Sequence, residues 1–240
     1  MCSEKISREH YISANLLRAN NDGRTAKIGG LRWQPNDTLQ DIGISSLQSK
    51  ILCETHNVQL SDLDTLAGSF FRVLNAADKN PESLPALTQI DGHSLERWLL
   101  KVICGLVAAN GKKNDLIPNI WKDILVGGCW PEEWGLYFPS SLDPQVLANE
   151  FFIQTFLHPD TRVVLASTFR IAGVCMNFAL GRPSKSNNFW NYRPRGIIFQ
   201  LNKTEKRVEF IWPFDTNEAI IYTKVGSTKE RPPQWQGWKD

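Results

Sequence analysis

Two short stretches in the first quarter of this 240-residue chain carry residue types that bind metals and move protons. Cys2 stands eight residues before His10, which follows directly after Glu9. About forty residues later, a Cys-x-x-His pair is followed at once by an asparagine, Asn57. Structural zinc sites use Cys and His ligands, and two of them often come from one tight pair of this kind. Hydrolysis of a phosphodiester needs a base and a divalent ion, and a neutral imidazole can act as that base.

The zinc site is expected to use Cys2, Cys53 and His56. Four Cys or His ligands are usual in structural sites, so a second tight pair should face the Cys53–His56 pair. Cys2 fits as the second member of a Cys-x-x-Cys pair whose first member would precede Met1. The other interpretation is a site with three protein ligands and an open or distant fourth position.

The second expected site is hydrolytic and lies beside the zinc. A hard ion such as Mg²⁺ or Mn²⁺ prefers oxygen ligands. Glu9 and the amide oxygen of Asn57 can supply them, while His10 takes the proton from water.

These residues resemble the HNH endonucleases, whose fold is the ββα-metal finger. The resemblance covers roughly residues 1–75, under a third of the chain. It implies that His10 is the general base, that Glu9 and Asn57 hold the catalytic ion, and that Cys2, Cys53 and His56 bind structural zinc. The chain departs from the family in its middle motif, because residues 45–50 contain no asparagine.

Simpler interpretations exist for each residue. His10 is also what a surface loop histidine would look like, and free cysteines such as Cys53 are often buried as small apolar side chains. Asn57 also suits the start of a helix, where asparagine commonly accepts backbone hydrogen bonds. Asp62 and Asp64 are expected to be solvated charges on a helix.

The elements that must position these residues follow from apolar spacing. Apolar residues recur at helical intervals in residues 56–77, 94–109 and 119–126. After about residue 160, β-rich runs occur at 162–168, 171–178, 196–201, 207–212 and 219–223. The predicted fold is therefore α+β, with an N-terminal HNH-like module, then helices, then a C-terminal antiparallel meander. The Pro-containing stretch 79–85 suggests two domains, residues 1–80 and 85–240, the second of which positions substrate, senses a signal or binds a partner.

A basic loop between residues 181 and 195 is a second candidate for nucleic-acid binding. It combines aromatic and polar residues with four cations that suit phosphate contact, namely Arg182, Lys185, Arg193 and Arg195. Its composition equally suits an ordinary hairpin connection or a contact with a protein partner.

Composition constrains the setting more than the function. The formal net charge is only +2, and five cysteines without the spacing of a disulfide scaffold favour a reducing compartment. We see no secretory signal and no apolar run of the roughly 20 residues that cross a bilayer, so the expected location is cytoplasmic.

The leading hypothesis is a metal-dependent endonuclease acting on DNA. The first alternative is a catalytically weak zinc protein that only binds nucleic acid. The second is an adaptor whose N-terminus is held by zinc and whose Trp-rich C-terminal region binds a protein. Oligomeric state and the choice between DNA and RNA are left open.

Overall fold

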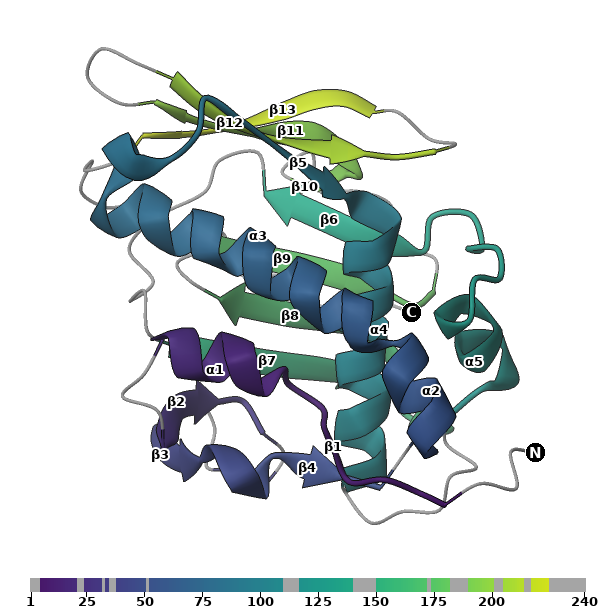
Figure 1. The fold of residues 1–240 in the computed structure, drawn as a ribbon. Helices are drawn as coiled ribbons and strands as arrows, with labels where there is room; N and C mark the ends of the chain where they lie inside the picture. Colours follow the sequence, from purple (N-terminus) through teal and green to yellow (C-terminus); the bar gives the residue numbers. More distant parts are fainter. Residues whose placement is uncertain are drawn as a thin grey trace.

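The computed structural model describes residues 5–20, 24–31, 33–34, 38–50, 52–109, 117–139, 150–171, 174–181, 190–200, 205–213 and 217–224. The fold is mixed α+β (Figure 1). Its helices are α1 (Ala14–Asn20), α2 (Glu54–Gln59), α3 (Ser61–Lys79), α4 (Gly92–Ala109) and α5 (Asn119–Leu125), with short 3-10 turns at Ile44–Ser46 and Pro81–Ser83. No helix in the described parts of the chain is both long and apolar enough to cross a membrane.

Two long helices, α3 and α4, pack against each other. On α3, Leu63, Ala67, Phe70 and Leu74 are buried at intervals of three and four residues, which puts them on one face. The predicted helix 56–77 is present, but it is divided at Leu60 into α2 and α3. The division separates the Cys53–His56 pair, at the start of α2, from the packed helix that follows.

Helix α4 begins two residues earlier than its sequence predicts. The Ser94 backbone N–H donates to the Asp91 side chain at 2.8 Å, so Asp91 caps the helix. Asp91 ends a strand, so the cap joins that strand directly to the helix. Most of α4 is buried, which fits its wide apolar surface.

A seven-stranded sheet forms the centre of the molecule, in the order β10-β6-β9-β8-β7-β2-β3. Its strands are β2 (Thr25–Gly29), β3 (Leu39–Gly43), β6 (Gly135–Pro139), β7 (Glu150–Leu157), β8 (Val164–Ile171), β9 (Val174–Ala179) and β10 (Trp190–Tyr192). Strands β7, β8 and β9 form an antiparallel meander, whereas β2 pairs parallel to β7. Figure 1 shows α3 and α4 lying across one face of this sheet.

A four-stranded sheet lies beside it, in the order β13-β11-β12-β5. It contains β5 (Leu87–Asp91), β11 (Pro194–Gln200), β12 (Glu205–Ile211) and β13 (Asn217–Lys224). The expected meander holds for the β11–β12 hairpin but not for β13, which pairs parallel to β11. The physical reason is that β5 occupies the other edge of β12, in parallel register.

The segments before and after the predicted boundary at residues 80–85 share structure. Strand β2 pairs with β7 in the central sheet, and one cluster of buried apolar residues includes Ile28, Phe70, Trp98 and Phe169. Separate folding of residues 1–80 and 85–240 stays a prediction, and it would divide both a sheet and a core.

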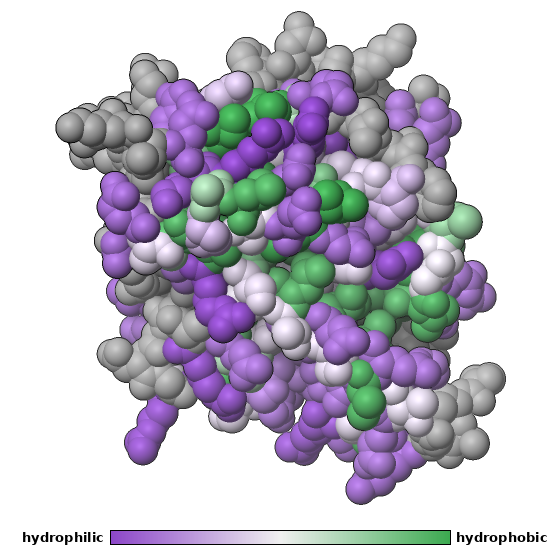
Figure 2. Space-filling view, turned by 45° about the horizontal axis from the view of Figure 1, so that its top comes forward, coloured by the Kyte–Doolittle hydropathy of each residue, from purple (hydrophilic) through white to green (hydrophobic). Residues whose placement is uncertain are grey.

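The surface drawn in Figure 2 carries apolar side chains in several areas among hydrophilic ones. The large apolar side chains that are most exposed include Val58, Val126 and Trp33, at 73%, 64% and 61%. Val58 and Val126 flank the region that contains the predicted site.

Candidate functional site

The N-terminal segment and the chain before α2 form a strand–strand–helix arrangement. Strand β1 (Glu9–His10) pairs antiparallel with β4 (Gln48–Ser49). The pairing continues to Ile6, which forms an isolated antiparallel bridge with Cys53, the residue directly before α2. The two predicted metal-binding stretches, far apart in sequence, therefore lie side by side.

The side chains of Cys53 and His56 face each other. The Cys53 Sγ lies 3.0 Å from His56 Nδ1, a sulfur–nitrogen hydrogen bond. Two ligands of one tetrahedral zinc would stand about 3.5 Å apart, given bonds of about 2.3 and 2.0 Å. The pair thus fits zinc after a small opening. Cys2 lies outside the described residues, and within them no group of three His, Cys, Asp or Glu side chains is arranged to hold a metal.

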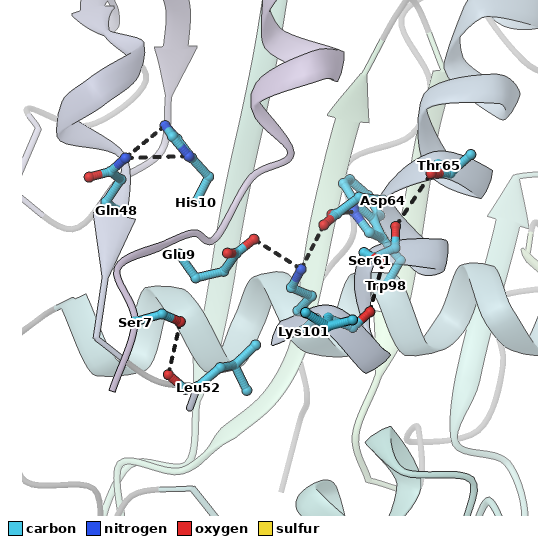
Figure 3. A network of polar contacts seen from close by, with 11 residues as sticks. Ser7, Glu9, His10, Gln48, Leu52, Ser61, Asp64, Thr65, Trp98 and Lys101 are labelled. Atoms are coloured by element: carbon cyan, nitrogen blue, oxygen red, sulfur yellow. Dashed lines mark hydrogen bonds and ion pairs between the residues drawn. The ribbon is translucent and has the colours of Figure 1, made fainter. Parts of the chain in front are cut away.

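Glu9 points toward Lys101 of α4 (Figure 3). Its Oε1 accepts from Lys101 Nζ at 3.3 Å, and Lys101 also donates to Asp64 Oδ2 at 2.7 Å. The second Asp64 oxygen accepts from Trp98 Nε1 at 3.1 Å. Lys101 is only 1% exposed, so this ammonium is buried with carboxylates on two sides.

His10 points in the opposite direction, toward Gln48 (Figure 3). Gln48 is the direct cross-strand partner of His10, and its Nε2 lies 3.3 Å from His10 Nε2. Burial lowers the pKa of His10 below its usual 6.5, and the nearby Arg18 adds to this, while Glu9 opposes it. The imidazole is therefore held in its neutral form, which is the form that a general base needs.

The third predicted residue, Asn57, lies on α2 directly after His56 and is partly exposed. Its backbone N–H donates to the Cys53 carbonyl at 2.9 Å, as expected for the first turn of a helix. No hydrogen bond joins Asn57 to Glu9 or His10 among the residues that the structure describes. The joint role of Glu9 and Asn57 as oxygen ligands of one ion stays a prediction.

Sequence reasoning missed Lys101 and Asp64. Asp64 was expected to be a solvated charge, but it is 19% exposed and bonded through both oxygens. One signal was available: Lys101 falls within the apolar stripe of α4, three residues after Trp98. A charged residue on a buried helical face requires a partner.

A cleft of about 590 Å³ opens beside α2. Its lining includes His56, Asp62 and Arg97, together with Val126. Arg97 is held at the cleft wall because its Nε donates to the Ile124 carbonyl at 3.0 Å. His56 therefore lies at the wall of this cleft.

Of the four cations proposed for the basic loop, the two that the structure describes, Arg193 and Arg195, are both paired with carboxylates. Arg193 is 2% exposed, and its Nε and Nη2 both donate at 3.0 Å to the fully buried Glu96. That pairing removes Arg193 from phosphate contact. Arg195 lies on the surface and pairs with Glu218 and Glu209. Arg182 and Lys185 lie outside the described residues.

Comparison with known proteins identifies no relative for this arrangement. No protein-family model matches the chain, and no curated protein or solved structure matches it either.

Proposed function

We propose that this chain is a metal-dependent endonuclease of the HNH type that hydrolyses phosphodiester bonds in DNA. The observation that carries the proposal is the antiparallel pairing of residues 6–10 with residues 48–53, immediately before α2. This strand–strand–helix arrangement brings the Glu9–His10 strand to the helix that begins after Cys53. It is the arrangement expected of a ββα-metal finger.

His10 acts as the general base in this proposal. Its lowered pKa keeps the imidazole neutral near pH 7, and the Gln48 amide N–H donates to whichever ring nitrogen is unprotonated. Cys53 and His56 hold a structural zinc with Cys2, and this zinc fixes the start of α2 against the N-terminal strand.

A divalent ion such as Mg²⁺ or Mn²⁺ would neutralise the negative charge that develops on the phosphate. Glu9 is the carboxylate nearest to His10 in sequence, and one of its oxygens is engaged by Lys101. Glu9 must therefore bind the ion through its other oxygen, or turn away from Lys101. Asn57, on α2, supplies the second oxygen donor in this proposal.

The test is cleavage of supercoiled plasmid with Mg²⁺ or Mn²⁺, comparing wild type with His10→Ala. His158→Asn is the matched control, because it removes a histidine from the turn between β7 and β8 and leaves a side chain that can still accept the turn's N–H groups. We expect wild type and the control to cut, and His10→Ala to lose at least 100-fold in rate, in the range of general-base contributions. Cutting by His10→Ala at the wild-type rate would refute the assignment of the base.

The ion pair between Glu9 and Lys101 favours a second candidate, a zinc-bearing protein that binds nucleic acid without cutting it. A buried ammonium beside the proposed ligand opposes a second cation at the same carboxylate. If wild type fails to cut with either metal yet binds DNA, this second function replaces the first.

A further inference from the structure

The ribbon formed by β1 and β4 has two chemically different faces. Side chains alternate along an extended strand, so Glu9 and Ser49 share one face while His10 and Gln48 share the other. The first face packs on α4, where Ser49 is buried and Glu9 reaches Lys101. The second face is turned away from the core.

Two cations extend the outer face. Arg8 precedes His10 by two residues and Lys50 follows Gln48 by two, so both fall on the His10 side of the ribbon. Backbone hydrogen bonds on both sides of β1 keep this segment extended, from Ser7 N–H to the Leu52 carbonyl and from Tyr11 N–H to the Leu47 carbonyl. Both Arg8 and Lys50 are exposed.

A third cation, Arg18 on α1, lies in the neighbourhood of His10. Arg18 is exposed, and it lies close enough to His10 to affect its charge state. Among the residues that the structure describes, no carboxylate forms an ion pair with Arg8, Arg18 or Lys50, whereas the exposed Lys5 pairs with Glu54 at 3.6 Å. The whole chain carries only +2, so these three charges form a local basic surface.

We propose that Arg8, Arg18 and Lys50, which surround His10 on the outer face of the β1–β4 ribbon, bind the phosphodiester backbone of DNA. Unpaired exposed cations suit phosphate contact, since binding releases counterions from the nucleic acid. The neutral His10 and the amide of Gln48 lie between them, where a bound phosphate would be held against a base. This inference deepens the proposed function by naming the surface that delivers the substrate.

The test is fluorescence anisotropy of a labelled 24-base-pair DNA duplex at several salt concentrations. The variant Arg8→Gln/Lys50→Gln is compared with Arg72→Gln/Lys122→Gln, which removes the same charge from exposed positions on α3 and α5. We expect the first variant to bind roughly tenfold more weakly and to lower the log–log salt slope by about two. The control variant should keep the wild-type slope of log affinity against log salt concentration within about half a unit. Its lower net charge should change that slope only slightly.

Two further variants guard against loss of folding. Arg8→Lys/Lys50→Arg keeps both charges and should restore binding, and Arg18→Gln should lower the slope by about one. Equal affinity and slope in wild type and Arg8→Gln/Lys50→Gln would overturn the inference. So would an equal loss in the Arg72→Gln/Lys122→Gln control, because that result would assign binding to total charge.

The outcomes separate this inference from the proposed function. DNA binding that depends on Arg8 and Lys50, without cleavage by wild type, supports the surface and rejects the nuclease. Cleavage that depends on His10, with binding unaffected by these cations, supports the nuclease and rejects the surface.

Discussion

At the scale of single residues, the direction of a side chain decides its chemistry. Glu9 and His10 are neighbours in sequence, but Glu9 reaches a buried ammonium while His10 reaches Gln48 on the other face. The two residues therefore experience different surroundings. The carboxylate is charge-paired, and burial depresses the pKa of the imidazole.

The depressed pKa of His10 predicts the pH dependence of cleavage. A general base works when it is unprotonated, so the rate should fall as pH decreases through the His10 pKa. Because that pKa lies below 6.5, we expect the acid limb to have its midpoint below pH 6.5. Single-turnover cleavage rates from pH 5 to 8 measure it. A midpoint above 6.5 would contradict the assigned role.

At the scale of elements, buried ion pairs join parts of the chain that are distant in sequence. Lys101 links α4 to α3 through Asp64 and to the N-terminal strand through Glu9. A similar pair, Glu96 and Arg193, joins α4 to the turn between β10 and β11. Lys101 thus attaches α4 to α3 and to the N-terminal strand, whereas Glu96 attaches α4 to the turn between β10 and β11.

Replacing Lys101 tests the first of these links. Lys101→Met leaves two carboxylates without their shared partner, and we expect a loss of about 3 kcal/mol in the free energy of unfolding. Lys5→Met breaks an ion pair whose side chains are 84% and 62% exposed, and it should change that free energy by less than about 1 kcal/mol. Urea unfolding of both variants measures the difference. Similar losses in the two would show that Lys101 does not act through its buried pair.

The Glu96–Arg193 pair predicts a pH-dependent stability. Burial raises the pKa of Glu96 to about 7, although Arg193 opposes that rise. A carboxyl with a folded pKa above its unfolded value favours folding when protonated, so its contribution is complete below pH 4.5 and is lost as pH rises through 7. We expect the stability difference between wild type and Glu96→Gln to shrink from pH 5 to pH 8. If the free energies of unfolding of wild type and Glu96→Gln change with pH in parallel, the prediction is contradicted.

At the scale of the whole molecule, residues 1–80 and 85–240 contribute to the same sheet and the same apolar core. The central sheet takes β2 and β3 from residues before 80 and its other five strands from residues after 85. Helices α3 and α4, one from each segment, pack together over this sheet (Figure 1).

A truncation tests whether residues 85–240 fold alone. The fragment loses α3, β2 and β3, and so exposes the faces that they cover, including the side of Trp98 that packs against Phe71 of α3. We expect the fragment to lack a cooperative thermal transition by circular dichroism, whereas the full chain should show one. A cooperative transition in the fragment would establish two autonomous domains.

Local pattern in the sequence was enough for several of the elements and for the Cys53–His56 pair. Apolar spacing predicted α4, α5 and the strands β11 and β12, because such periodicity reflects which face of an element is buried. The contact between Cys53 and His56 was also predictable, since residues three apart at a helix start are close whatever surrounds them.

Only the tertiary structure decided which side chains meet across the fold. Lys101 and Glu9 are 92 residues apart in sequence, and Arg193 and Glu96 are 97 apart. Such pairs depend on which strand edges and helix faces are brought together, and no local period encodes that. For the same reason the outward direction of His10, and the cations that accompany it, followed from the register of β1 against β4.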